Sequence, residues 1–326
     1  MFFIQPKNTT KIISKKILVA THVITSVLHH TIHDHVVPLS VSWYARSIIR
    51  RSYEMFGIFK KQRSANKRWL VYALMSYIVM LVVNGLAGST TLIGGTDTAA
   101  VSDAYPNLFA PAGYTFAIWG VIYLLLGLYL ARMFGAWRPK KQLLPTQTQD
   151  QLLRLFTVSS VLNTLWLFAW QYRIFWLSVV IMLGLLVSLI QINRLLAPAK
   201  LPLREYLLIR VPFSVYFGWI SVATIANITT WLVSIGWDRW GQGEGTWMVA
   251  ILIVGALIGL VTAYRAQDPA YIAVFVWAYA GILIKHLSDT GHNGKYPTTI
   301  VVLTILIAVM INSTIKLAGR DIPRKG

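Results

Sequence analysis

Tryptophan and asparagine recur at helical spacing in two apolar stretches of the sequence. The stretch 207–233 contains Trp219, Ala223, Asn227 and Trp231, at steps of four residues. The stretch 153–171 contains Ser159, Asn163, Trp166 and Trp170, at steps of four, three and four. Residues at such steps share one face of a helix. Indole faces bind flat, apolar or cationic ligands by stacking and cation–π contact, and amides add hydrogen bonds.

Side chains for other kinds of chemistry are missing from the apolar stretches. None of the 11 acidic residues lies inside one, so paired carboxylates, metal ligands and ion-coupling groups are lacking there. The chain also has no cysteine, no GxxxxGK[ST] phosphate loop and no HExxH helix. We therefore expect a protein that is not an enzyme, with no catalytic residues, no metal site and no required cofactor. An ion-coupled pump is disfavoured.

The elements that carry these residues are predicted to span a membrane. Only 13% of the 326 residues are charged, about half of the roughly 25% that is usual in soluble domains. Eight apolar runs are long enough to cross a bilayer, namely 69–88, 113–131, 153–171, 176–193, 207–233, 247–264, 269–285 and 298–316. The backbone must satisfy its own hydrogen bonds in hydrocarbon, so each run predicts a helix. We expect an all-α integral membrane protein with eight transmembrane helices.

The basic residues alternate between the two sides of these spans. With the N-terminus placed in the cytoplasm, 26 Lys and Arg residues fall on the cytoplasmic side and 4 on the opposite side. Without residues 1–68 the ratio is still 14 to 4. This asymmetry follows the positive-inside rule, so the net charge of +19 does not indicate nucleic-acid binding. We expect an integral protein of a bacterial-type plasma membrane, with both termini in the cytoplasm. An organelle membrane is the alternative.

The depth of the aromatic and amide residues indicates a shared site. Either run of Trp and Asn alone is more typical of helix packing, in which small residues allow close approach and Asn bonds across the interface. At about 1.5 Å per residue, however, Trp119, Asn163, Trp166 and Asn227 all lie roughly 8–12 Å below the outer face. Trp176 lies at its rim. The loop 89–112 covers this layer, which suggests a mostly apolar small-molecule cavity between helices.

The first 66 residues form a basic N-terminal extension. Residues 1–54 hold five of the seven histidines and contain no run long enough to span a membrane. The tract from His29 to His35 could bind a metal, but a disordered or non-native extension before Met55 fits better, and an organelle-targeting segment is a weaker alternative. We divide the rest into 67–235, a five-helix bundle, and 236–326, a three-helix C-terminal extension. The role we expect for that extension is packing.

Three motifs in the first of these regions resemble the TspO/MBR family, which comprises the tryptophan-rich sensory proteins and the mitochondrial translocator protein. The segment 105–127 reads YPNLFAPAGYTFAIWGVIYLLLG and resembles the family's proline-rich loop and its W-G-x-x-Y-x-x-x-G helix. Leu162-Asn163-Thr164-Leu165-Trp166 resembles its L-N-x-x-W motif. The run from Trp219 to Trp231 resembles the W-x3-A-x3-N-x3-W pattern of its last helix. The resemblance covers about 69–235.

The resemblance implies a five-helix bundle that binds porphyrins, sterol-like lipids or synthetic aromatic ligands beneath the first loop. At the matching positions Trp176, Trp219 and Ala223 would contact the ligand. Asn163, Trp166 and Asn227 would line the cavity or join helices. Tyr114 stands near the place of a loop tryptophan that is implicated in the family's photo-oxidative breakdown of porphyrin. Such activity is therefore not expected.

Together these observations predict a membrane sensor or binding protein for a hydrophobic aromatic ligand. The predicted ligand-binding residues are Tyr114, Trp119, Asn163, Trp166, Trp176, Trp219, Ala223 and Asn227. A facilitator or exporter of such a ligand is the alternative, and a tetrapyrrole-modifying enzyme a lesser one. The expected partners are the lipid bilayer and the ligand, such as a porphyrin or haem-like molecule, and the chain could form a homodimer.

Overall fold

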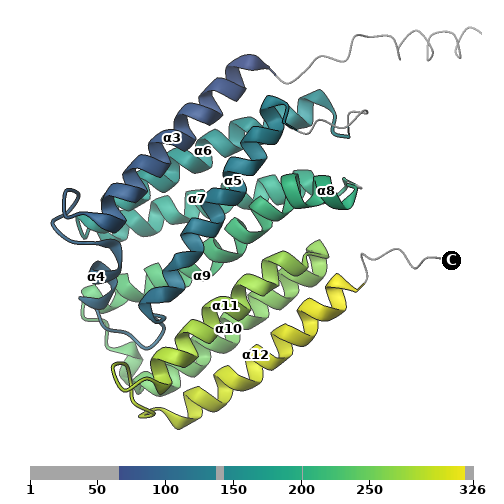
Figure 1. Cartoon of the computed structure of the whole chain (residues 1–326). Helices are drawn as coiled ribbons and strands as arrows, with labels where there is room; N and C mark the ends of the chain where they lie inside the picture. The colour runs from purple at the N-terminus through teal and green to yellow at the C-terminus, as the bar shows by residue number, and fades with distance from the viewer. Residues whose placement is uncertain (1–65, 137–142, 200, 320–326) are drawn as a thin grey trace, which may run out of the picture. The chain divides into compact units, whose positions relative to one another are not determined.

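The computed structural model describes residues 66–136, 143–199 and 201–319, in which every predicted span is helical (Figure 1). The long helices are α3 (Lys67–Ser89), α5 (Ile118–Phe134), α6 (Thr146–Gln171), α7 (Phe175–Leu196), α9 (Val211–Ser234), α10 (Glu244–Ala266), α11 (Pro269–Leu287) and α12 (Pro297–Ala318). Short helical pieces are α4 (Thr98–Asp103), η1 (Gly113–Ala117), α8 (Leu203–Glu205), η2 (Tyr206–Arg210) and η3 (Arg239–Gly241). Eight helical segments are long and apolar enough to cross a membrane, and the described residues contain no strand. The predicted all-α membrane fold is confirmed.

The fifth span begins earlier than the predicted residue 207. It runs without a break through α8, η2 and α9, from Leu203 to Ser234. The piece η2 is a single π-helical turn, in which the Val211 amide donates to the Tyr206 carbonyl five residues earlier. Pro212 comes directly after this turn. A proline has no amide hydrogen and its ring crowds the preceding turn, so the wider turn accommodates it within a continuous helix.

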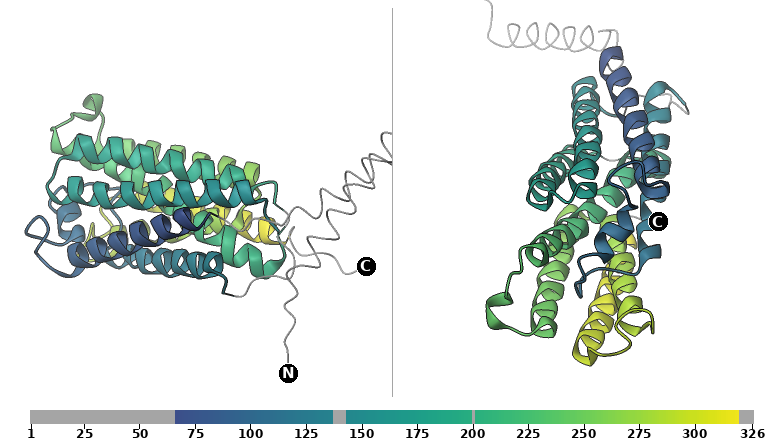
Figure 2. Two further views of the ribbon diagram at one scale, coloured as in Figure 1. Left: turned by 90° about the horizontal axis from the view of Figure 1, so that it is seen from above. Right: turned by 90° about the vertical axis from the view of Figure 1, so that its left-hand side faces the viewer.

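The first five long helices form a ring in which each contacts the next. Its order is α3, α6, α7, α9 and α5, and α5 closes the ring against α3. The three C-terminal helices lie on one side of this ring, where α11 packs against α9 and α12 covers α10 and α11 (Figures 1 and 2). Helix α9 therefore contacts both groups.

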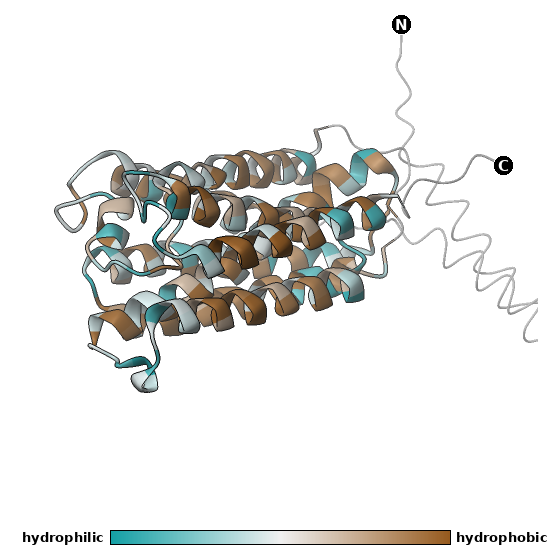
Figure 3. Cartoon of the chain, turned by 90° about the horizontal axis from the view of Figure 1, so that it is seen from below, coloured by the Kyte–Doolittle hydropathy of each residue, from teal (hydrophilic) through white to brown (hydrophobic). Residues whose placement is uncertain are grey.

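The outer faces of the helices are apolar, as a surrounding bilayer requires. On α3, for example, the side chains of Val71, Met75, Val79 and Val82 are all about half exposed. Apolar patches of this extent are rare on soluble monomers. Hydrophilic positions concentrate at helix ends and in the loops (Figure 3). The chain is an integral membrane protein whose helices contact lipid.

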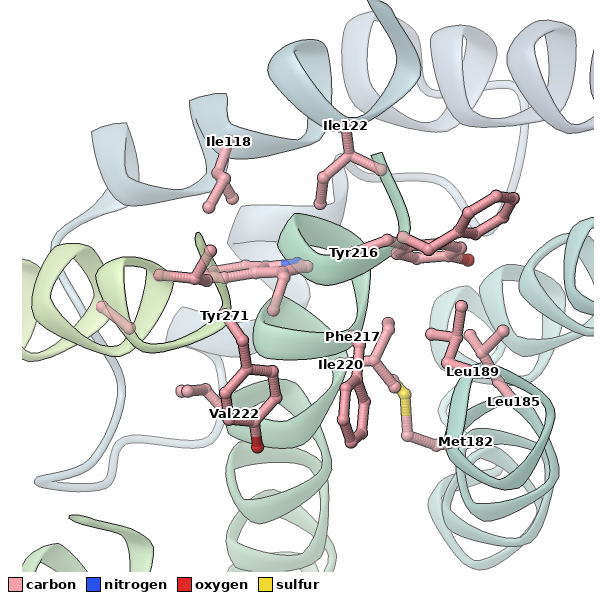
Figure 4. Packing of buried hydrophobic residues seen from close by; sticks show 14 of the residues in the cluster. Ile118, Ile122, Met182, Leu185, Leu189, Tyr216, Phe217, Ile220, Val222 and Tyr271 are labelled. Atoms are coloured by element: carbon pink, nitrogen blue, oxygen red, sulfur yellow. The ribbon is translucent and has the colours of Figure 1, made fainter. Parts of the chain in front are cut away.

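Helix α9 also supplies the centre of the core. Its Tyr216 and Ile220 side chains are fully buried, facing α5 and α7 (Figure 4). On its other side Phe217 packs against Tyr271 of α11, with 4.6 Å between ring centroids. The apolar packing therefore continues from the five-helix ring into the C-terminal helices, and Tyr271 also donates a hydrogen bond to Ser221 of α9.

The proposed domain limits stay predictions. Almost all of the N-terminal extension 1–66, including its histidine tract, lies outside the described residues. The division at residue 235 falls in the connection between α9 and α10.

Candidate ligand-binding site

A cavity of about 50 Å³ lies beneath the connection between α3 and α5, which we call the cover and define as residues 90–117. Its wall is built by α5, α6, α9 and α11 together with the cover itself. The lining residues are Thr98, Ser102, Asn107, Phe109, Ala110, Pro111, Phe116, Trp119, Trp166, Trp170, Trp219, Val222, Ala223, Ala226, Asn227, Thr230, Ala278 and Ile282. We call this space the tryptophan cavity. Four of its lining residues are tryptophans, and none carries an ionisable side chain.

Trp119 lies at the centre of the aromatic wall. Its ring stacks on Trp166 of α6, with centroids 6.1 Å apart and an interplanar angle of 30°. It meets Trp219 of α9 edge to face, again at 6.1 Å. The Tyr216 ring completes the contact from one turn earlier on α9, also at 6.1 Å. Rings from three helices therefore form one aromatic layer, which includes Trp119 and Trp166, the two tryptophans predicted to lie at matching depth.

The buried Asn227 side chain holds this layer together by hydrogen bonds. Its Oδ1 accepts a bond of 2.9 Å from Trp166 Nε1, and its Nδ2 donates to Ser178 Oγ of α7 at 2.8 Å. Trp170 Nε1 donates to the Thr98 carbonyl of the cover at 3.2 Å. By contrast, the indole Nε1 of Trp219 is buried and has no hydrogen-bond partner among the described residues. A buried polar group without a partner is rare and needs an explanation.

Asn163, a predicted cavity residue, lies outside the cavity wall. Its side chain is fully buried and donates to the Tyr216 hydroxyl at 3.0 Å. Its Oδ1 accepts from Asn84 Nδ2 of α3 at 2.8 Å. Asn163 thus joins α3, α6 and α9 next to the cavity, which is the helix-packing role that such a residue most often has.

Trp176 and Tyr114 also do not line the cavity, which corrects the prediction for both. Trp176 is 58% exposed, because the preceding residue, Phe175, takes the inward position and packs on Trp170 at 5.4 Å. Neighbouring helical residues point in directions about 100° apart, so only one of the two can face inward. Tyr114 is 48% exposed and touches Trp277 edge to face. Two residues on, Phe116 takes the place inside, 6.0 Å from Trp219.

Several residues of the wall were not predicted from the sequence. The tight 3-10 turn η1 brings Phe116 inward, and the spacing of the residues in a loop does not reveal such a turn. Helix α11 contributes Ala278 and Ile282, although only packing was expected of the C-terminal helices. A usable signal for α11 was its Gly281. A Cβ there would overlap the Thr115 side chain, so only glycine lets the cover approach this closely.

Helix α11 also fastens the cover through three hydrogen bonds to backbone carbonyl groups and one ion pair. The Ala112 amide donates to the Gly281 carbonyl at 3.1 Å, and Trp277 Nε1 donates to the Thr115 carbonyl at 2.9 Å. His286 Nε2 donates to the Leu108 carbonyl at 3.0 Å. Lys285 Nζ and Asp103 Oδ1 form the ion pair, at 3.1 Å. The C-terminal helices therefore hold the cover closed over the tryptophan cavity.

This fastening is expected to weaken in mild acid, because His292 packs on His286 with 4.6 Å between ring centroids. Burial lowers the pKa of His292, and the nearby His286 and Lys285 lower it further, against an opposing effect of Glu244. The folded state therefore favours the neutral imidazole, whereas the unfolded chain titrates near pH 6.5. This contribution to stability is complete above about pH 6.5 and is lost as the pH falls below it.

The corresponding measurement is the thermal unfolding midpoint in detergent, followed by tryptophan fluorescence between pH 7.5 and 5.5. We expect the midpoint to fall on acidification, and to fall less in His292→Gln. Parallel curves for the two proteins would contradict this role of His292.

The described lining offers a ligand aromatic faces, two amides and hydroxyl groups, without a charge. No group of three or more His, Cys, Asp or Glu residues in the described ranges is arranged to hold a metal ion. An uncharged, apolar part of a ligand fits such a wall best, since an unpaired charge is strongly disfavoured in a dry cavity. A hydrogen-bond acceptor on that ligand could pair with the Trp219 Nε1–H, which has no partner among the described residues.

A comparison with protein families matches residues 68–316 to the family described as TSPO-like protein. The matched region extends from α3 into the last turn of α12, so it includes the three C-terminal helices. No curated protein and no solved structure matches the chain.

Proposed function

Since the chain belongs to the TSPO-like protein family, we propose that it binds or senses a hydrophobic aromatic ligand in the tryptophan cavity. Membership of this family supports a binding or sensor role in a membrane. The observation that carries the finer proposal is the unpartnered Nε1 of Trp219 in a wall of stacked indoles. A flat apolar ligand with one hydrogen-bond acceptor, such as a porphyrin, a sterol-like lipid or an isoprenoid, would satisfy both features.

Binding of such a ligand requires the cavity to widen. Its volume of about 50 Å³ is far below that of sites for small organic ligands, which usually measure about 300–1,000 Å³. The wall that can yield most easily is the cover, because it is a connection between helices and not part of the ring. Ligand binding and release would then be coupled to movement of residues 107–116. A sensor needs such a coupling.

Binding is favoured over transport and over catalysis. Next to the cavity, the hydrogen-bonded side chains of Asn84, Asn163 and Tyr216 tie three helices together. Such a layer opposes the opening that a facilitator needs. No ionisable group lines the described cavity wall, so proton transfer to a bound ligand has no donor or acceptor there. We propose that the ligand is bound unchanged, without a resident cofactor, by a protein with both termini in the cytoplasm.

Two substitutions in the wall test this proposal. Ala223→Phe fills the cavity and is expected to abolish binding. Trp219→Phe keeps the ring but removes the N–H, so it should weaken binding roughly threefold to tenfold, the worth of one hydrogen bond. Affinity is measured by quenching of tryptophan fluorescence during titration with protoporphyrin IX, a sterol and an isoprenoid.

The matched controls carry the same replacements outside the cavity. Ala250→Phe lies on an exposed face of α10, and Trp176→Phe replaces an exposed tryptophan. Both should bind like the unchanged protein. Equal affinities for Ala223→Phe and Ala250→Phe would remove the site from the tryptophan cavity.

A further inference from the structure

A second and larger cavity, of about 290 Å³, lies between α9 and α10 beside the cover. Its walls are the last turns of α9, the connection 236–239, the first turns of α10 and cover residues 106–109. The lining residues are Pro106, Asn107, Leu108, Phe109, Thr229, Leu232, Val233, Gly236, Trp237, Asp238, Arg239, Glu244, Trp247, Met248 and Ile251. We call it the α9–α10 cavity. Among the C-terminal helices, α10 contributes Glu244, Trp247, Met248 and Ile251.

This cavity changes from apolar to charged along its length. Leu232, Met248 and Ile251 form an apolar part on the helices. The rim, at the ends of α9 and α10, holds the charged side chains Asp238, Arg239 and Glu244. A wall that is apolar at one end and charged at the other fits an amphiphile better than a purely apolar molecule.

The rim can hold both signs of charge on one ligand. Arg239 Nη1 lies 3.6 Å from Glu244 Oε1, which is too long for a hydrogen bond, and its Nε donates to the Gln242 carbonyl at 3.4 Å. Most of the five guanidinium donors are thus available to a phosphate or carboxylate. A cation would meet the carboxylates and the faces of Trp237 and Trp247, which pack together at 4.7 Å. Because the two carboxylates disfavour a bare anion, a zwitterionic head fits the rim best.

Phe109 and Asn107 line both cavities, so this short piece of the cover separates them. The Asn107 side chain fixes the backbone there, since its Oδ1 accepts from the Phe109 amide and its Nδ2 donates to the Tyr105 carbonyl, both at 3.1 Å. The Phe109 ring is buried, and the aromatic ring nearest to it is that of Tyr279, 6.5 Å away. The phenyl ring is held by packing alone, and its displacement would join the two spaces.

We propose that the two cavities form one site for a zwitterionic amphiphile. Its apolar body enters the tryptophan cavity, its head stays at the rim of Asp238, Arg239 and Glu244, and the ring of Phe109 moves aside between them. The tryptophan cavity alone is too small for such a ligand, while the joined space reaches the size of a usual small-molecule site. This inference rests on the proposed function and assigns the C-terminal helices a part in ligand recognition.

The test uses two pyrene probes, because excited tryptophans of the protein transfer energy to a bound pyrene. Binding is therefore measured as pyrene emission on excitation of tryptophan. One is a lysophosphatidylcholine with a pyrene at the end of its acyl chain, and the other is the pyrene-labelled fatty alcohol, which has the same body without the head. We expect the headed probe to bind about tenfold more tightly. Arg239→Gln should remove most of that difference and leave the affinity for the alcohol unchanged.

The absence of cysteine from the chain allows a single thiol to report occupancy. In Ile251→Cys the thiol faces the α9–α10 cavity, and in Ile253→Cys, on an exposed face of the same helix, it does not. A saturating amount of the headed probe should slow modification of the first thiol by N-ethylmaleimide about tenfold or more and leave the second unchanged. Phe109→Ala should speed association of both probes.

The outcomes separate this inference from the proposed function. If Ala223→Phe weakens binding of both probes while the Ile251→Cys thiol stays unprotected, the tryptophan cavity binds alone and the inference is wrong. If the thiol is protected and Ala223→Phe has no effect, the ligand never enters the tryptophan cavity, and the proposed function fails together with the idea of one joined site. Should Ile251→Cys not fold, Val233→Trp, at a partly exposed position of the same wall, must weaken binding of the headed probe.

Discussion

Glu205→Leu is expected to lower the free energy of unfolding by about 3–5 kcal/mol, the cost of leaving a buried charge without its partner. Glu205 accepts two hydrogen bonds from Arg132 Nε, at 2.9 and 3.2 Å. The two side chains are only 5% and 11% exposed. The pair joins the end of α5 to the start of the continuous segment that contains α9. The replacement leaves the Arg132 guanidinium buried beside an apolar group, so the ends of α5 and α9 should separate.

The measurement is reversible unfolding in mixed micelles, followed by circular dichroism. The double variant Arg132→Leu with Glu205→Leu should recover much of the loss, because no unpaired charge remains. An exposed ion pair supplies the matched control. Arg239 and Glu244 are 37% and 52% exposed, so Arg239→Gln should change stability by no more than about 1 kcal/mol. If the double variant is as unstable as Glu205→Leu alone, the loss of stability comes from lost side-chain packing and not from an unpaired buried charge.

Gly218→Ala is expected to destabilise the protein by about 1–3 kcal/mol, although the same change usually stabilises a helix. Gly218 lies on α9 where α11 crosses it. A Cβ there would lie 2.7 Å from the Tyr271 carbonyl oxygen and 2.9 Å from the Val274 Cβ. The first of these atoms is backbone and cannot rotate away, so α11 must move. Since α11 fastens the cover, the affinity for ligand should fall together with the stability.

Two other glycines separate this packing effect from helix propensity. Gly85 on α3 and Gly120 on α5 have no atom within 4 Å of an added Cβ. Gly85→Ala and Gly120→Ala should therefore raise stability by about 0.5–1 kcal/mol, measured as for Glu205→Leu. A neutral or stabilising Gly218→Ala would mean that α11 does not approach α9 as closely as the structure places it.

Both predictions concern contacts that position α9 relative to its neighbours α5 and α11. The buried ion pair positions α9 against α5 at one end, and the contact at Gly218 positions it against α11. The tryptophan cavity lies where α5, α9 and α11 meet. Substitutions far from the cavity can therefore alter ligand affinity through the spacing of these helices. Each affinity measurement needs the stability of the same variant beside it.

The sequence predicted the site in part, and the pattern of success has a physical cause. Spacing within one helix correctly grouped Trp219 with Ala223 and Asn227, because a helix repeats regularly and neighbours on one face stay neighbours. Rise per residue placed Trp119 and Trp166 at matching depth for the same reason. The family resemblance suggested Trp176 as a ligand contact, but spacing does not tell which of two adjacent large side chains faces inward, and Phe175 takes that position. Helical spacing also does not apply to the cover, where the turn η1 places Phe116 in the cavity wall and leaves Tyr114 outside it.

By itself the sequence determined the eight helices, their membrane environment and the faces that carry indole and amide groups. These follow from local requirements, namely the hydrogen bonds of a backbone in hydrocarbon and the regular repeat of a helix. Only the tertiary structure decided that α11 holds the cover, that Phe109 separates two cavities and that Asn163 joins helices outside the wall. These depend on which side chains fill the space between helices distant in the chain, and such packing is a property of all the partners together.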